Sequence, residues 1–286
     1  MTFAGPFLAV DWGTTNRRVY LIEEGTVRRT ERDDRGVTSV TDFESTVAAM
    51  RTDFGDLPML LAGMVGANIG WRHIPYVSAP ANIADLASGL SWIDERTAIV
   101  PGVRTANDVM RGEEVQLLGA VKTGLAAPRA VLVQPGTHSK WVWMEGGRIE
   151  RFTTAMTGEL FGLLRRHSLL APLLDGQIEC GVAYLEGVNA GINGDLAATL
   201  FSIRAGNILG TSETGNSAAF ASGLLIGNEV AHRMTEIGDL PVIVLAGPEL
   251  GRLYCSAITA QGGTATMIDS QSAFVAGIVA IRDELT

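Results

Sequence analysis

The chain has 286 residues, with 47% hydrophobic residues, 19% charged residues and a formal net charge of −9. At about 100 to 200 residues per domain this length predicts two domains, each able to bury a core without disulfides or a structural metal. The 22 basic residues are outnumbered by 31 acidic ones and form no Lys/Arg-rich block, so we expect no nucleic-acid partner.

The cysteine content and the hydropathy of the chain indicate the cellular compartment in which the protein works. Cys180 and Cys255 lie far apart and form no C-x-x-C pair, which favours a reducing compartment and gives no cysteine-based zinc site. Residues 1–10 lack the basic start of a signal peptide. The longest charge-free stretches, such as 57–71 and 214–228, are shorter than the ~18 residues of a membrane span and contain Gly, Asn or Ser. We therefore expect a cytoplasmic protein without a membrane partner.

The first half of the chain alternates strand-like and helix-like segments. An apolar strand, a polar turn, a return strand and a second turn are predicted at 7–10, 13–16, 18–22 and 23–25. Helices are then predicted at 43–51, 82–90 and 113–123, and strands at 59–62 and 97–100. Gly, Ala-Ala and Pro interrupt the pattern at 124–129. We place the domain boundary there, between residues 1–125 and 126–286.

The opening hairpin recurs about 123 residues later, with Gly13 falling on Gly136 and Thr14 on Thr137. The second copy is a strand, a turn, a return strand and a closing turn at 130–133, 136–139, 141–144 and 145–147. Helices follow at 159–167, 218–234, 250–258 and 271–283, with a strand at 242–246. A repeated glycine-threonine hairpin that opens each half predicts two α/β domains of like topology facing each other.

The first hairpin loop has the chemistry of a phosphate site. Asp11 follows the apolar strand directly, and Gly13 permits close approach of the backbone. Successive N–H groups in such a turn form an anion-binding concavity, to which Thr14 and Thr15 add hydroxyl donors. Asp11 could hold Mg²⁺ through water, because Mg²⁺ is usually bound by one or two carboxylates plus substrate phosphates. An ordinary hairpin turn capped by Asp11 is the alternative.

The second hairpin loop carries Thr137, His138, Ser139 and Lys140 after Gly136. Gln134 stands where the first copy has Asp11, so we expect the metal to be held from the first domain only. His138 could contact a phosphate or substrate oxygen, or form only a local hydrogen bond. Lys140 is either a charge at the edge of a strand or a phosphate ligand.

Two further segments are candidates for chemistry. Glu113 follows Gly112 at the start of a predicted helix, where the field of the helix stabilises an ionised carboxylate that can accept a proton. Glu113 is therefore a candidate base, with an ordinary first-turn acid as the alternative. Gly247 and Pro248 follow the strand at 242–246, and loops at the carboxyl ends of strands bind ligands in open α/β sheets, so this turn could contact a nucleotide.

Taken together, these motifs resemble the 2-dehydro-3-deoxygalactonokinase family of the actin-like ATPase and sugar kinase superfamily. The matching blocks follow one another in order over about the first 60% of the chain. They are AVDWGTTN at 9–16, GMVG at 63–66, GW at 70–71, APA at 79–81, PG at 101–102, DVMRGEE at 108–114, PGTHSKW at 135–141 and MTGELF at 156–161.

The resemblance implies an actin-like ATPase (ribonuclease H-like) fold, in which two similar α/β domains enclose a nucleotide cleft. The phosphate-1 loop and the sugar-acid site would lie in residues 1–125, and the phosphate-2 loop and the adenosine site in residues 126–286. The implied reaction is phosphorylation of the 6-hydroxyl of 2-dehydro-3-deoxy-D-galactonate by ATP and Mg²⁺, giving 2-dehydro-3-deoxy-6-phosphogalactonate in galactonate breakdown.

The resemblance also implies roles for single residues. Asp11 would hold the hydrated Mg²⁺, and Glu113, which stands where broader sugar kinases carry Asp, would act on the sugar hydroxyl. The groups implied for ATP are Gly13, Thr14, Thr15, Gly136, Thr137, His138, Ser139, Gly247 and Pro248. The substrate is a carboxylate and should meet a cation. The substrate-site candidates are Asn16, Arg17, Trp71, Arg72, Arg111 and Lys140, where Trp71 is either a wall of the site or a core residue.

Two other functions stay open. A kinase of the same fold that acts on another sugar acid or a polyol would share every phosphate-loop argument. The second alternative is an actin-fold protein that binds nucleotide as a switch or regulator, without a small-molecule acceptor. Against it, we expect no appended DNA-binding or peptide-binding domain. The sequence does not decide between a monomer and a homodimer, nor the stereochemistry at C4, nor hexonate against pentonate.

Overall fold

The computed structural model describes residues 3–211 and 216–285. The chain divides into two compact units. Unit 1 comprises Met1–Pro128, Trp143–Phe152 and Ser270–Thr286, and unit 2 comprises Arg129–Val142 and Thr153–Asp269. The division after Pro128 lies close to the boundary predicted at 125/126. However, the C-terminal segment, which the prediction assigned to the second domain, groups with unit 1.

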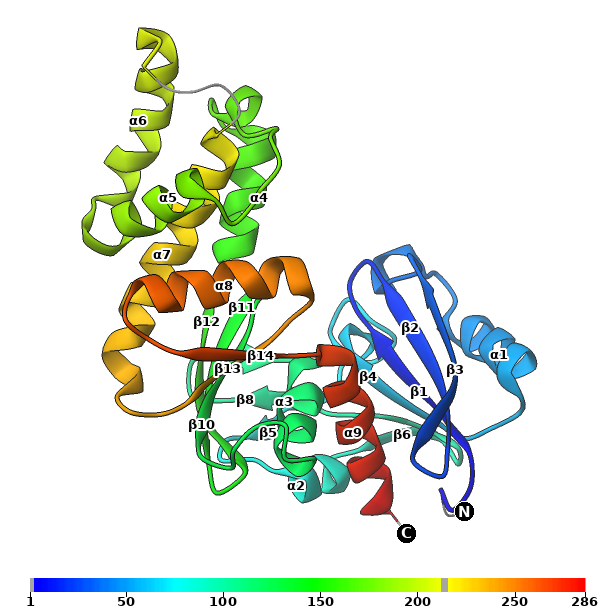
Figure 1. Ribbon diagram of the computed structural model, residues 1–286. Coiled ribbons are helices and arrows are strands. Elements are labelled where there is room, and N and C mark those ends of the chain that lie inside the picture. The colour runs from blue at the N-terminus through cyan, green and yellow to red at the C-terminus, as the bar shows by residue number, and fades with distance from the viewer. Residues whose placement is uncertain (1–2, 212–215, 286) are drawn as a thin grey trace. The chain divides into compact units, whose positions relative to one another are not determined.

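Unit 1 is built on a six-stranded sheet of order β3-β2-β1-β4-β7-β6 (Figure 1). Strand β1 is antiparallel to β2 and parallel to β4, and β4 is in turn parallel to β7. The strands are β1 (Phe7–Trp12), β2 (Arg17–Glu23), β3 (Thr26–Asp33), β4 (Met59–Gly63), β6 (Ser91–Asp94) and β7 (Thr97–Ile99). A small second sheet contains β5 (Val77–Ser78), β8 (Val103–Arg104) and β9 (Val109–Met110).

The helices of unit 1 begin at positions that their sequences explain. The unit contains α1 (Phe43–Phe54), α2 (Ile83–Ser88), α3 (Glu113–Lys122), α9 (Ser270–Asp283) and the short 3₁₀ helices η1 (Val37–Ser39) and η2 (Met64–Gly66). The Asp42 side chain accepts from the Ser45 amide at the start of α1, and Asn82 and Asp85 form a reciprocal capping box at α2. These caps explain why both helices were predicted within a few residues.

Close backbone packing explains why the C-terminal helix belongs to unit 1. A Cβ atom on Gly277 of α9 would lie 1.9 Å from the carbonyl oxygen of Val115 in α3. A Cβ on Gly119 of α3 would lie 2.1 Å from the carbonyl oxygen of Ala273 in α9. Only glycine permits such an approach. Helix periodicity predicts α9 correctly but carries no information about its packing partner.

Unit 2 contains a sheet of order β12-β11-β10-β13-β14, and the unit boundary passes through β11 and β12. The strands are β10 (Ala130–Gln134), β11 (Ser139–Glu145), β12 (Arg148–Ala155), β13 (Val242–Leu245) and β14 (Ala265–Ile268). The order repeats that of β3-β2-β1-β4-β7 in unit 1. The strand-turn-strand repeat seen in the sequence is therefore confirmed as two sheets of like topology.

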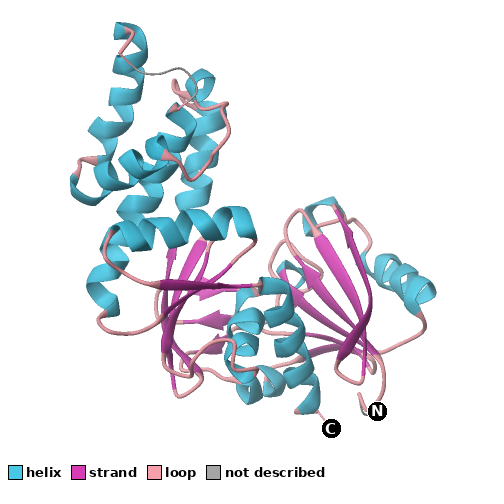
Figure 2. Cartoon of the chain, in the orientation of Figure 1, coloured by secondary structure: helices cyan, strands magenta, loops and turns pink. Residues whose placement is uncertain are grey.

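Helices α4 (Thr157–His167), α5 (Val182–Asn193), α6 (Leu196–Leu209) and α7 (Ser217–Ile237) form a helical layer of unit 2, with η3 (Ala171–Leu173) between α4 and α5 (Figure 2). The remaining helix, α8 (Pro248–Ala260), follows β13. The sequence analysis missed α5 and α6. Helix α5 carries Gly187, which is unfavourable in an isolated helix. Here a Cβ on Gly187 would lie 2.1 Å from the carbonyl oxygen of Phe220, so glycine allows α5 to lie against α7.

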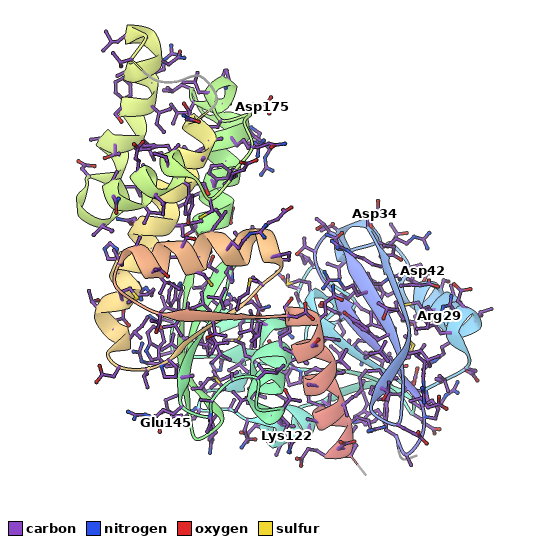
Figure 3. All side chains as sticks on the ribbon, viewed as in Figure 1. Arg29, Asp34, Asp42, Lys122, Glu145 and Asp175 are labelled. Atoms are coloured by element: carbon purple, nitrogen blue, oxygen red, sulfur yellow. The ribbon has the colours of Figure 1, made fainter. Side chains whose placement is uncertain are left out.

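The two longest strands that the sequence analysis missed, β3 and β12, are mostly polar. Strand β3 has the sequence TVRRTERD and lies at the edge of its sheet, where exposed charged residues are common. Charged side chains cover other exposed positions of unit 1 as well, and Figure 3 labels Arg29, Asp34, Asp42 and Lys122 among them. Within the described residues, no helix combines the length and the apolar composition that crossing a bilayer requires.

Candidate active site

Three segments of unit 1 converge at the ends of β1 and β4. The two strands are parallel neighbours, with Asp11 opposite Ala62 and Trp12 opposite Gly63. Gly63 has a φ of 95°, and a Cβ there would lie 2.7 Å from the Trp12 carbonyl oxygen. A Cβ on Gly112 would lie 3.1 Å from the Gly63 Cα. The first loop, the turn after β4 and the start of α3 are thus adjacent.

The first loop is held from behind by the segment around η1. The amides of Gly36 and Val37 donate to the carbonyl oxygens of Thr15 and Gly13, at 3.2 and 3.0 Å. The Thr38 hydroxyl donates to the Thr14 carbonyl oxygen at 2.8 Å. A Cβ on Gly36 would lie 2.2 Å from that same oxygen, so only glycine fits there. The sequence analysis did not identify this support, because no local pattern connects the two segments.

The side chains of the first loop face outward. Thr14, Thr15 and Asn16 are exposed, and Asn16 donates from Nδ2 to the Thr15 hydroxyl at 2.9 Å. The carbonyl groups of Thr14 and Thr15 are bonded to the segment behind, so these two residues present hydroxyl groups rather than carbonyl oxygens to the surroundings. This arrangement suits the binding of an anion.

Two carboxylates at this convergence interact electrostatically. Burial raises the pKa of Asp11 to about 6, Arg18 opposes that shift, and the nearby charge of Glu113 adds to it. Glu113 is half-buried in the first turn of α3, and its Oε2 accepts from the Arg111 amide at 2.9 Å. The structure therefore brings together the two acids that the sequence analysis placed in the metal and base roles.

Glu114, the next residue, lies in the interior. Its side chain has no exposed surface, and both of its carboxyl oxygens lie 2.8 Å from the Gly112 amide, which donates to them. Burial, followed by the charge of Glu113, raises the pKa of Glu114 to about 8. Glu114 stabilises the turn at Gly112, which has a φ of 106°. The sequence analysis chose Glu113 as the candidate base but did not predict that Glu114 is buried.

Two of the four candidate cations are buried in unit 1. Arg17 is 5% exposed, pairs with Asp33 and lies over the Trp12 ring at 5.2 Å. Arg111 is 7% exposed, donates from Nη2 to the Ile74 carbonyl oxygen at 2.7 Å and lies over a tyrosine ring. In both residues Nε and Nη1 are buried without a hydrogen-bond partner. The structure holds both guanidinium groups inside unit 1.

The other two cations differ in accessibility. Lys140 is a buried residue of unit 2, and its Nζ donates to the Thr154 hydroxyl at 2.9 Å. Arg72 is exposed, and its side chain forms no hydrogen bond or ion pair within the described residues. Beside it, Trp71 stacks on Phe43 at 6.2 Å between ring centroids and is only partly buried. Trp71 therefore packs on the core and still has an accessible surface.

The second loop, in unit 2, is supported by the start of α4. The Glu159 amide donates to the Thr137 carbonyl oxygen at 2.9 Å, and the Glu159 carboxylate lies 2.5 Å from His138 Nε2. A Cβ on Gly158 would lie 2.2 Å from the Gly136 carbonyl oxygen. Thr137 and His138 are exposed, so they are the accessible side chains of this loop.

Ser139 differs from Thr137 and His138 because it has no exposed surface. Its hydroxyl lies 2.7 Å from the hydroxyl of Tyr254. The turn at Gly247 and Pro248 is exposed and follows β13, which is parallel to its neighbour β10. The two turns therefore follow the same edge of one sheet, the edge at which open α/β sheets bind ligands.

A dedicated metal cage is absent from this arrangement. Among the residues that the structure describes, no three His, Cys, Asp or Glu side chains gather closely enough to hold an ion. Asp11 and Glu113 are only two carboxylates. Such a pair is compatible with Mg²⁺, which keeps most of its waters and binds through one or two carboxylates together with phosphates.

Comparisons with known proteins show the family of the chain. A family model described as 2-keto-3-deoxy-galactonokinase matches residues 11–281. The 2-dehydro-3-deoxygalactonokinase of Escherichia coli (strain K12) is 37% identical over 285 residues, which cover 96% of this chain and 97% of that protein.

Solved structures extend the comparison to the fold. A Sinorhizobium meliloti protein proposed to be a 2-dehydro-3-deoxygalactonokinase has a TM-score of 0.89 at 34% identity, covering 96% of this chain and 97% of its own. An activator of 2-hydroxyisocaproyl-CoA dehydratase from Clostridium difficile, solved with bound ADPNP, shares only the fold, with a TM-score of 0.51 at 11% identity. The family match reaches well beyond the part of the chain that carries the sequence motifs. The chain belongs to the 2-keto-3-deoxy-galactonokinase family, also called 2-dehydro-3-deoxygalactonokinases, which are carbohydrate kinases with the actin-like ATPase fold.

Proposed function

We propose that the protein transfers the γ-phosphoryl group of ATP to the 6-hydroxyl of 2-dehydro-3-deoxy-D-galactonate. The observation that carries the proposal is the convergence of Asp11, the Gly13–Thr15 loop and Glu113 in unit 1. One such site offers a carboxylate for a cation, a concave loop for phosphate and an acid at a helix start. Phosphoryl transfer requires these functions together.

Glu113 is the proposed base. In the transfer, a bond forms between the sugar oxygen and the γ-phosphorus while the bond from that phosphorus to the β-phosphate oxygen breaks. The electron pair of the broken bond leaves with ADP, and the proton of the sugar hydroxyl passes to Glu113. Glu113 lies half-buried in the first turn of α3, so its carboxylate can be reached from solvent.

Asp11 is the proposed partner of Mg²⁺, held through water. Burial and the charge of Glu113 raise the pKa of Asp11, so its surroundings hold too little positive charge for the ionised carboxylate. A divalent cation would supply that charge and neutralise the phosphate oxygens. In the first loop, Thr14 and Thr15 would donate to phosphate. In the second loop, Thr137 and His138 are the candidate phosphate donors.

Arg72 is the proposed anchor of the substrate carboxylate. It is the exposed member of the four candidates, whereas Arg17, Arg111 and Lys140 are buried. A guanidinium group binds a carboxylate through two parallel hydrogen bonds, which also orients it. Trp71 precedes it in sequence and offers an apolar surface to the deoxygenated C3 methylene.

The direct test is Mg²⁺-dependent release of ADP by the purified protein. The acceptors to compare are 2-dehydro-3-deoxy-D-galactonate, its gluconate epimer, a few aldonic acids and no acceptor. Stimulation by the first compound supports the proposal. Stimulation only by another sugar acid would assign a different substrate, and nucleotide binding without any stimulation would favour a regulator.

The same assay tests the base. We expect Glu113→Gln to lower turnover by orders of magnitude, because the amide cannot accept the proton, while the melting temperature changes little. The matched control is Glu44→Gln, which changes an exposed first-turn acid of α1 in the same unit. A Glu113→Gln enzyme with near-normal turnover would remove Glu113 from the base role.

A further inference from the structure

Glu229 is an acid in the interior of unit 2 that no phosphate-loop argument uses. It lies on α7 and is 7% exposed. Trp141 Nε1 donates to its Oε1 at 2.6 Å, and the Tyr254 hydroxyl donates to its Oε2 at 2.8 Å. The Thr157 hydroxyl also forms a hydrogen bond to this carboxylate. Three donors from three different elements therefore meet on one side chain.

Each of these donors is connected to the second loop. Trp141 lies on β11, two residues after Ser139. Thr157 is the first residue of α4, and the next two residues of that helix pack on the Gly136 carbonyl oxygen and pair with His138. Tyr254 contacts Ser139 directly. The residues that support the loop at Ser139 and those that support it from the start of α4 therefore all hydrogen-bond to Glu229 or lie next to a residue that does.

Proton counting sets the direction of the hydrogen bonds. The Tyr254 hydroxyl has one proton, which it donates to Glu229. Its 2.7 Å contact with Ser139 must then be one in which the Ser139 hydroxyl donates to the Tyr254 oxygen. The proton of Ser139 is engaged by Tyr254, so this hydroxyl cannot donate to a phosphate. Ser139 contributes to the loop through its fixed position.

We propose that Glu229 is the positioning residue of the second phosphate loop, and that it acts through Tyr254 and Ser139 on one side and through Thr157 on the other. The inference rests on the proposed function in so far as this loop binds the phosphates of ATP. A buried carboxylate is costly even when it is paired, and apolar packing of the same volume often stabilises a fold equally well. Three converging donors under a loop with two exposed polar side chains are consistent with a role in orienting that loop.

The test removes one hydroxyl from the network. Tyr254→Phe breaks the link between Glu229 and Ser139 and keeps the ring. We expect the Kd for MgATP, measured by calorimetry on the full chain, to rise about 5-fold to 10-fold, the equivalent of one lost hydrogen bond. The KM for the sugar acid should stay within about twofold of the wild-type value, because the proposed sugar-acid site lies in unit 1.

A matched control separates positioning from folding. Tyr184 is a second fully buried tyrosine of unit 2, and its hydroxyl donates to the Leu253 carbonyl oxygen at 2.7 Å. Tyr184→Phe removes the same atom and leaves every hydrogen bond of the loop network in place. It should lower the melting temperature to a similar extent and leave the Kd for MgATP within about twofold of the wild-type value. An equal weakening of MgATP binding by both variants would overturn the inference.

A double-mutant cycle tests the connection itself. Ser139→Ala breaks the same link from its other end, so it provides the same readout if Tyr254→Phe fails to fold. The combined variant should bind MgATP no more weakly than the worse single variant, because both changes remove one interaction. Additive losses, or a Kd within about twofold of the wild-type value in both single variants, would refute the inference.

These outcomes also separate the inference from the proposed function. A wild-type protein that binds MgATP but phosphorylates no sugar acid contradicts the proposed function. The Kd comparison then still tests the positioning role, with weakened binding in Tyr254→Phe alone supporting it. A wild-type protein that does not bind MgATP would overturn both.

Discussion

Replacing Glu114 with Gln should remove part of the loss of stability that the wild-type protein shows as the pH rises. Glu114 has no exposed surface, and its carboxyl group accepts hydrogen bonds from the backbone amides of Gly112 and of Glu114 itself. Burial, with the charge of Glu113 second, raises the pKa of Glu114 from its ordinary 4.5 to about 8. The folded protein therefore holds a proton that the unfolded chain releases.

The sign and the size follow from this difference. Because the pKa of Glu114 is higher in the folded state, its contribution to stability is complete below about pH 4.5 and is lost as the pH rises through about 8. The change from 4.5 to about 8 corresponds to about 5 kcal/mol in total, at about 1.4 kcal/mol per pH unit within that interval. The Gln side chain does not ionise, so the Glu114→Gln variant should not show this loss of stability.

The measurement is urea unfolding of both proteins at intervals between about pH 5 and about pH 8. The stability of the wild-type protein should fall relative to that of Glu114→Gln, by up to several kcal/mol across the range. Asp11 and Glu229 also have raised pKa values, but they are present in both proteins and cancel in the difference. Parallel curves for the two proteins would show that Glu114 is ionised in the folded state and would refute the reasoning.

Three further changes test other parts of the structure. Gly277→Ala should destabilise the protein by about 3 kcal/mol or more in thermal unfolding, because the new Cβ would lie 1.9 Å from the Val115 carbonyl oxygen. Gly5→Ala, with nothing within 4 Å of its Cβ, is the control, and equal melting temperatures would contradict the packing argument. Arg72→Met should raise the KM for the sugar acid about tenfold or more while the KM for ATP stays unchanged, and an unchanged sugar-acid KM would move the carboxylate anchor elsewhere. Asp11→Asn should lower turnover by orders of magnitude without lowering the melting temperature, and near-normal ADP release would exclude Asp11 from metal binding.

Most regular elements could be predicted from local patterns. The apolar run at β1, the capped helix α1 and the glycine before α3 are signals contained within a few residues. The elements that escaped prediction depend on neighbours. Strand β3 is polar and forms against β2, and α5 contains glycines that become favourable only against α7.

The candidate site shows the same distinction. The sequence predicted that Asp11 and Glu113 act together, and the structure places them close enough for the charge of Glu113 to raise the pKa of Asp11. The sequence did not predict that Arg17 and Ser139 are buried, because burial depends on which segments cover a side chain. The choice of Arg72 as carboxylate anchor therefore became possible only with the folded chain.

By itself, the sequence determined the family, the repeated hairpin topology and the residues that form the two loops. These properties reside in short motifs and in local periodicity, which survive without knowledge of the fold. Tertiary structure decided that the C-terminal helix belongs to unit 1, that Glu114 is internal while Glu113 is half-buried, and that Glu229 lies beneath the second loop. Each of these depends on contacts between segments far apart in the chain, where burial and close packing, rather than residue type, set the free energy of a side chain.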